Sequence, residues 1–170
     1  MDPAWVIERL ECNAAVLEAQ LRQVRQVQAI WKPAPNKWSI LEVINHLADE
    51  EIDDFRMRLS LVLKDPTMEW PPIDPDRAAI ERRYNDRELA ESFERFIRAR
   101  AQSVEWLRSL RQTNWQTAHQ HPRAGSLKAG DLLSSWLAHD LIHIRQINRL
   151  HHEYLTATAG EFSTAYAGNW

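Results

Sequence analysis

Apolar residues recur at spacings of three and four along four long stretches of the chain, which is the period of an amphipathic α-helix. In the first stretch, Asp2 is an expected N-cap and Pro3 suits the first helical position. The apolar stripe then continues as far as Trp31, and the two prolines that follow within residues 32–37 forbid its continuation. The pattern therefore predicts a first helix over about residues 3–31.

The second helix has a clear start signal in the segment WSILEV. Ser39 can accept a hydrogen bond from the backbone of Glu42 while the Glu42 side chain reaches back, which is a capping box. Trp38 can pack on Val43 across this cap as a hydrophobic staple. We predict a helix over about residues 39–63.

Residues 65–85 contain four prolines and form the longest interruption in the pattern. A connection of this length can cross from one end of a helical bundle to the other, so the helices that it joins can run parallel. Asn85 is the expected cap of a third helix over about residues 86–111, and a fourth follows over about residues 127–152. We expect an all-α protein, with residues 1–170 forming a single four-helix-bundle domain.

The composition agrees with a helical globule and excludes several other classes. Of the 170 residues, 44% are hydrophobic and only 4 are glycine, which argues against disorder and against a turn-rich β fold. The net charge of −3 gives no electrostatic reason to expect nucleic acid or an anionic membrane as a partner. Because no apolar run approaches the roughly 20 residues of a membrane span, and the N-terminus lacks the order of a secretion signal, we expect a cytoplasmic protein.

Candidate chemistry lies in the segment SSWLAHDLIHIRQINRL. His139 and His143 are four residues apart on the apolar stripe of the fourth helix, together with Trp136 and Gln146, so both imidazoles can approach one ion. His46 lies about 10 Å into the second helix, and the midpoint of the pair lies about 15 Å from the end of the fourth. If these two helices are antiparallel, the three rings are nearly level and can form a metal site with an open coordination position.

Carboxylates follow His46 in the segment HLADEEIDD. Glu50 falls one turn beyond His46 on the same face, and Asp49 and Asp53 flank it. Glu50 or Asp49 could orient a histidine through its second nitrogen or act as a base. The competing interpretation is a solvated acidic helix face, and for the histidines it is a set of surface or hydrogen-bonded core residues.

The segments WSILEVINHLADEE and WLAHDLIHIRQI resemble the motifs of the DinB-like (DinB/YfiT) superfamily of bacterial metalloenzymes. The resemblance covers most of the chain and implies a four-helix bundle of up-down-down-up topology, with a long crossover between helices two and three. It implies a divalent ion, most often zinc or nickel, held by His46, His139 and His143. The implied topology makes helices two and four antiparallel, as the depth of the histidines requires.

The same resemblance implies a function. It favours a metal-dependent transferase that uses a low-molecular-weight thiol against a small electrophile. Two alternatives stay open, which are a metal-dependent hydrolase using metal-bound hydroxide and a non-catalytic metal-binding stress-response or dimerisation module. We expect a small-molecule substrate and a homodimer, and no nucleic acid or membrane partner.

Overall fold

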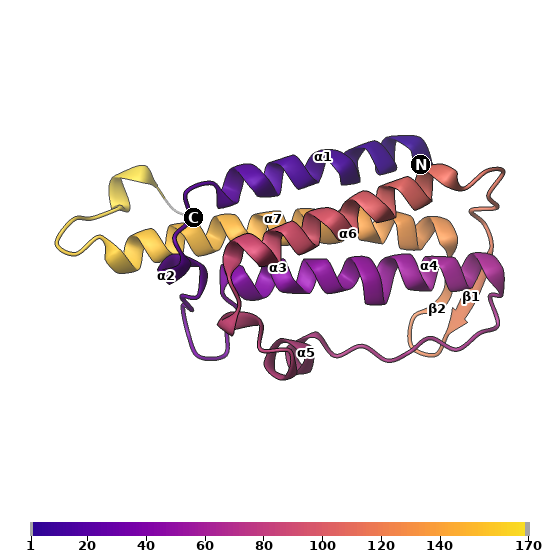
Figure 1. Ribbon diagram of the computed structural model, residues 1–170, viewed down its shortest axis with the longest axis horizontal. Coiled ribbons are helices and arrows are strands. Elements are labelled where there is room, and N and C mark those ends of the chain that lie inside the picture. Colours follow the sequence, from indigo (N-terminus) through magenta and orange to yellow (C-terminus); the bar gives the residue numbers. More distant parts are fainter. Residues whose placement is uncertain (1, 169–170) are drawn as a thin grey trace.

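The computed structural model describes residues 2–168, and its main body is a bundle of long helices (Figure 1). The helical and strand segments are α1 (Pro3–Leu21), α2 (Gln26–Ala29), α3 (Ile40–Asp49), the π-helix η1 (Glu50–Asp54), α4 (Phe55–Lys64), α5 (Pro75–Glu81), the 3₁₀ turn η2 (Tyr84–Asp86), α6 (Leu89–Ser109), β1 (Ala118–His121), β2 (Gly125–Lys128), α7 (Ala129–Thr158) and the 3₁₀ turn η3 (Ala165–Ala167). No helix in this described part of the chain is long and apolar enough to cross a lipid bilayer.

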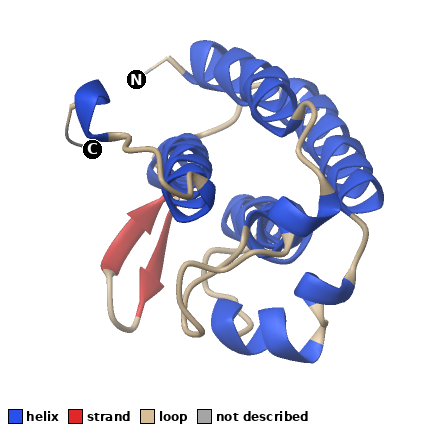
Figure 2. Cartoon of the chain, turned by 90° about the vertical axis from the view of Figure 1, so that its left-hand side faces the viewer, coloured by secondary structure: helices blue, strands red, loops and turns tan. Residues whose placement is uncertain are grey.

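The long helices pack side by side in two opposite directions. In Figure 1, α1 and α7 run from right to left, whereas the rod formed by α3, η1 and α4 and the helix α6 run from left to right. Helix α3 packs mainly on α6, α1 packs on α7 and α6, and α4 packs on α7. Strands β1 and β2 form an antiparallel hairpin that stands to one side of the helices (Figure 2).

The first helix is shorter than the sequence pattern predicts. Asp2 caps it by accepting a hydrogen bond from the backbone nitrogen of Ala4, as expected, but α1 ends at Leu21 rather than near Trp31. The chain leaves the helix because Gln23 adopts a left-handed conformation, with φ of 67°, and α2 is a separate short turn. The apolar stripe continued across this break because both segments face the same core.

The second rod begins as predicted, and it contains a π-helical turn that its sequence does not predict. The capping box is confirmed, since the Glu42 nitrogen donates to Ser39 Oγ at 3.1 Å and the Ser39 nitrogen donates to Glu42 Oε2 at 2.8 Å. All ten residues of α3 are buried. At Glu50–Asp54 the rod changes to a π-helix before α4 continues to Lys64. Such π turns are frequent at functional sites.

Elsewhere the predicted boundaries shift by a few residues. Asn85 does not cap the third long helix. Its side chain instead bonds Ser39 and the carbonyl of Ile30, and α6 starts at Leu89, after an N-cap residue that makes no side-chain capping bond. Helix α7 runs six residues beyond the expected end at His152. The crossover contains the short helix α5, and the loop before α7 contains the hairpin.

The hydrophobic core forms two clusters, with polar residues between them along each of the four long rods of the bundle. These rods are α1, the rod formed by α3, η1 and α4, α6 and α7. One cluster lies around α3 and the start of α6, and the other lies around α4 and the start of α7. Between the apolar positions of each long rod lies a buried polar position, at Asn13 in α1, Glu51 in η1, Arg100 in α6 and Asp140 in α7. The bundle therefore has a polar layer in its middle.

Arg100 is the centre of this layer and is 2% exposed. Its guanidinium donates to both oxygens of Asp140 at 2.7 Å and to Glu51 Oε1 at 2.7 Å. Asn13 also donates to Asp140, and the Trp136 indole nitrogen donates to Glu51. Since a buried charge is tolerated only when it is paired and hydrogen-bonded, these contacts join all four rods at one level.

Replacing Arg100 should test this layer. Arg100→Leu leaves Glu51 and Asp140 buried without their cation, and we expect it to lower the free energy of unfolding by about 3 to 5 kcal/mol. Urea denaturation measures this loss. The matched control is Arg108→Leu, which breaks an exposed ion pair with Glu11 and should cost much less. Equal losses in the two variants would contradict a structural role for the buried layer.

Candidate metal centre

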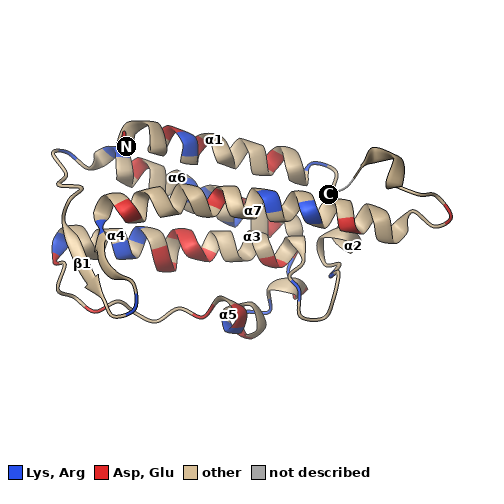
Figure 3. Ribbon diagram, turned by 180° about the vertical axis from the view of Figure 1, so that it is seen from behind, with Lys and Arg blue, Asp and Glu red and all other residues tan. Residues whose placement is uncertain are grey.

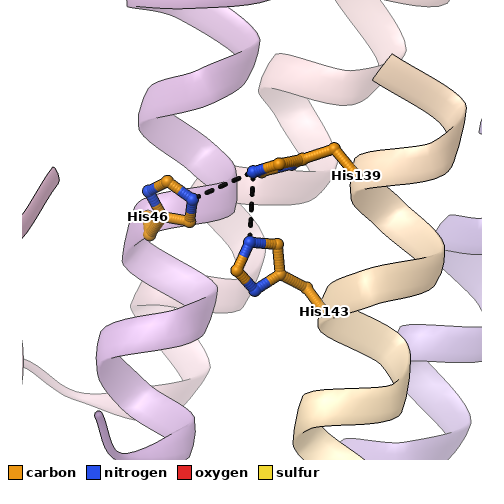
Figure 4. Close-up of side chains that lie close together, drawn as sticks. All are labelled: His46, His139 and His143. Carbon is orange, nitrogen blue, oxygen red and sulfur yellow. Dashed lines mark hydrogen bonds between the residues drawn. The ribbon is translucent and has the colours of Figure 1, made fainter. Parts of the chain in front are cut away.

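The structure brings together the three histidines that the sequence singles out. His46 extends from α3, and His139 and His143 extend from the facing side of α7 (Figure 4). The Nε2 atom of His139 lies 3.2 Å from Nε2 of His46 and 3.1 Å from Nε2 of His143. One nitrogen from each ring lies within 4.8 Å of the other two. The rings meet because α3 and α7 run in opposite directions (Figure 1).

Burial keeps these imidazoles neutral. Desolvation, followed by the charge of the neighbouring histidines, lowers the pKa of His46 to about 2. The same burial, together with His143 and Arg100, lowers the pKa of His139 to about 3. The pKa of His143 is also lowered, again mainly by burial. Neutral imidazole is the form that binds metal ions.

Contacts on the far side of two rings orient their nitrogens. Gln146 Oε1 lies 2.7 Å from His143 Nδ1, so this nitrogen donates its proton to Gln146 and leaves the lone pair of Nε2 directed at the shared point. His46 Nδ1 faces Glu50 Oε1 at 3.5 Å. Burial, and then the hydrogen bond and charge of Asp54, raises the pKa of Glu50 to about 9.

Aromatic rings enclose the histidines. Trp38 meets His46 edge-on with 4.8 Å between ring centroids, and it lies parallel to His143 at 6.5 Å. Phe55, which follows the π turn directly, lies 5.2 Å from His139 and stacks on Trp136. These rings hold the imidazoles in position and exclude water from their sides, which accounts for the burial that lowers their pKa values.

A cavity of about 800 Å³ lies beside His46, the one histidine of the cluster among its lining residues. His46 and Glu50 form part of its inner wall, and the crossover residues 71–75 with α5 form the outer wall. Met57, Ile52 and the crossover prolines give the cavity an apolar lining beside the acidic residues of η1. A volume of this size accommodates a small organic molecule next to the histidines.

Asp49 does not take the position that the sequence suggested for it. Its carboxylate receives hydrogen bonds from Arg82, Arg95 and Tyr84, which occupy it on the side of α5 and α6 rather than at a histidine. Asp53 pairs with Arg82 at 2.8 Å. Asp49 therefore links the rod that carries His46 to α6 and to the residue that follows α5, and Asp53 adds a second contact to that residue. Glu50 is the carboxylate that faces a histidine.

The cluster fits a divalent ion. Three nitrogen ligands at about 2.0 to 2.1 Å in a tetrahedral arrangement lie about 3.3 Å from one another. Two of the three pairs are close to this spacing, at 3.1 and 3.2 Å, and all three nitrogens lie within 4.8 Å of one another. Without a cation or a shared proton, the lone pairs of neutral imidazoles would repel at such distances. Three nitrogen donors leave further coordination positions for a small ligand, as in catalytic rather than structural sites.

Several residues that shape the site carried little signal in the sequence. Trp38 appeared as a helix staple, and Gln146 appeared as a polar residue that continues the apolar stripe of the histidines, without a role assigned to it. Glu51 appeared as one of a run of acidic residues, and only its contact with Arg100, 49 positions away, reveals its role. A polar or charged residue on the inward face of each rod was the one available indication.

Comparisons with known proteins identify the family of the chain. The model of the DinB superfamily matches residues 9–147, so the chain belongs to this superfamily. No curated protein matches the sequence significantly.

Two solved structures share the fold. The first is YfiT from Bacillus subtilis, described as a probable metal-dependent hydrolase with an unusual four-helix bundle topology, with a TM-score of 0.79 and 20% identity over 89% of this chain and 87% of that one. The second is TT2238, described as a four-helix bundle protein, with a TM-score of 0.61 and 21% identity over 87% of this chain and 99% of that one. At these identities the likeness shows the four-helix-bundle fold.

The histidine cluster predicts stoichiometric metal uptake. We expect one Zn²⁺ or Ni²⁺ per chain, and we expect His143→Ala to lose it while circular dichroism stays helical, because two nitrogens bind far more weakly than three. Metal analysis after dialysis measures this uptake. His121→Ala, on the hairpin, is the control and should keep the ion. Retention by His143→Ala would show that the ion is held elsewhere.

The lowered pKa values also predict a pH dependence of stability in the metal-free protein. Unfolded histidines bind protons below about pH 6.5, whereas the pKa values of His46 and His139 in the fold are about 2 and about 3. Their stabilising contribution is thus complete above pH 6.5 and falls below it, by up to about 1.4 kcal/mol per pH unit for each group.

Urea titrations with a chelator at pH 7, 6 and 5 measure this effect. The double variant His46→Gln, His139→Gln should lose less stability on acidification than the natural chain. The raised pKa of Glu50 acts in the opposite direction, since its contribution to the free energy of unfolding falls as the pH rises above about 4.5. Because Glu50 is present in both proteins, this effect is common to the two titrations. Equal acid slopes in the two proteins would show that the imidazoles titrate normally in the fold.

Proposed function

We propose that the protein is a divalent-metal-dependent transferase that joins a low-molecular-weight thiol to a small electrophile. The observation that carries this proposal is the convergence of three neutral imidazole nitrogens beside a cavity of about 800 Å³. A divalent ion held by His46, His139 and His143, with zinc or nickel as the first candidates, would supply Lewis-acid chemistry that lowers the pKa of a small nucleophile.

The surrounding residues hold the site in a form suited to this chemistry. Gln146 fixes the tautomer of His143, and Glu50 faces the outer nitrogen of His46. Trp38 and Phe55 exclude water from the sides of the rings. Asp49 binds Arg82, which directly follows α5, and Arg95 of α6, and so keeps the outer wall of the cavity attached to the rod that carries His46.

The source of the nucleophile follows from the chain's sulfur content. Cys12 is the single cysteine of the sequence, is exposed on α1, and is not among the residues that line the cavity. A sulfur nucleophile must therefore arrive as a separate small molecule, and the cavity has room for it beside an electrophile. Hydrolysis, with water as the nucleophile, is the second candidate, and the published description of YfiT favours it.

Turnover assays separate these candidates. The zinc- or nickel-loaded protein should accelerate displacement of chloride from 1-chloro-2,4-dinitrobenzene by cysteine or N-acetylcysteine. We expect His143→Ala to lower the rate at least about 100-fold, because the nucleophile loses its activating ion, and His121→Ala to leave it unchanged. Absorbance of the aryl thioether follows the reaction.

The alternative outcomes are distinct. Metal-dependent hydrolysis of 4-nitrophenyl acetate without any thiol, and no thiol transfer, would identify a hydrolase. Stoichiometric metal uptake with neither activity across a panel of thiols, electrophiles and esters would contradict the enzyme proposal and favour a non-catalytic metal-binding module.

A further inference from the structure

A second pocket lies on the other side of Trp38, between residues 33–38 and the second half of α7. Its volume is about 520 Å³, and its lining includes Trp38 and Gln146. Both side chains also contact the histidine cluster, since Trp38 lies parallel to His143 and Gln146 bonds His143 Nδ1. The second pocket and the metal centre therefore share a wall that is one side chain thick.

Positive charge gathers in this pocket although the chain as a whole carries a net charge of −3. Lys37, Arg145 and Arg149 line it, and Glu153 is the one carboxylate among the lining residues. Glu153 already pairs with Arg149 Nε at 2.7 Å. Lys37 and Arg145 have no carboxylate within ion-pair distance in residues 2–168. Figure 3 shows basic positions on the part of α7 near α2.

The pocket also offers neutral groups that suit an organic anion. Pro33, Ile142 and Leu150 supply an apolar lining, and Ile142 is 51% exposed. Gln146 uses its oxygen for His143, and its amide nitrogen has no hydrogen-bond partner within the described chain. This amide can donate to an occupant, so that binding in the pocket would be transmitted to His143 through one side chain.

We propose that this pocket is a second ligand site, which takes a small organic anion with a carboxylate or phosphate group on an apolar body. A concave surface lined by unpaired cations concentrates anions from solution, and Arg pairs well with both groups. The role of the pocket as a subsite for one of two reactants rests on the proposed function, whereas the binding of an anion does not.

Isothermal titration with three probes of similar size tests the site. Benzoate and phenyl phosphate carry the anionic group, and benzyl alcohol is the neutral counterpart. We expect both anions, or the one whose group the pocket prefers, to bind more tightly than the alcohol and to weaken as salt is added. The double variant Lys37→Ala, Arg145→Ala should weaken anion binding at least about 10-fold.

The control for lost charge is the double variant Lys64→Ala, Arg111→Ala, which removes two exposed cations outside this pocket and should leave binding unchanged. Equal weakening in both double variants, or equal binding of the alcohol, would overturn the proposal. The titrations are made with metal-free and metal-loaded protein. Anion binding without metal uptake would thus contradict the proposed function alone. Metal uptake without anion binding would contradict this inference alone.

A spectroscopic readout tests the link to the histidines. In Co²⁺-loaded protein, the anions should change the visible spectrum of the ion, and the Lys37→Ala, Arg145→Ala variant should lose this change at the same anion concentration. A spectral change that persists in this variant would show that the anion binds the metal directly, which would contradict a separate pocket.

Discussion

The convergence of three buried, neutral imidazoles is the constraint on which the rest of this structure depends. Each ring loses hydration when it is buried, and the cost is met only if its nitrogens find partners. Gln146 and Glu50 face the outer nitrogens of two rings, and the inner nitrogens face one another at 3.1 and 3.2 Å. A divalent ion would satisfy all three inner nitrogens at once, which would account for the position of these residues on apolar faces of α3 and α7.

The polar layer around Arg100, next to the histidines, fixes the register of the long helices against one another. Arg100 contacts Glu51 and Asp140, which lie on the two rods that carry the histidines. The π turn changes the phase of the second rod after His46, and Glu51 within it faces inward toward Arg100. A slip of α7 against α3 would break these ion pairs as well as the histidine cluster, so the two features support the same register.

Part of this arrangement could be predicted from sequence because it is local. The capping box at Ser39 involves residues three apart, and His139 and His143 share a face because they are four apart on a helix. The position of His46 opposite them could be inferred from helix depth once antiparallel packing was assumed. The family resemblance supplied that assumption.

The remaining features depend on contacts between distant positions or on backbone conformations without a marker residue. The left-handed Gln23 that ends α1 is not a glycine, so nothing in the sequence predicts the break. Asn85 has the residue type of a cap, but its side chain is used to bond Ser39 and Ile30. The two pockets arise from packing of the crossover and of residues 33–38 against the bundle, which no local pattern encodes.

X-ray absorption spectroscopy of the zinc-loaded protein tests the central claim most directly, because it reports the ligands of the ion itself. The structure predicts three imidazole nitrogens at about 2.0 to 2.1 Å, with the outer-shell scattering of the imidazole rings and at least one further light-atom ligand. A coordination shell of carboxylate oxygens alone, or one with fewer than three imidazoles, would contradict a metal centre at His46, His139 and His143.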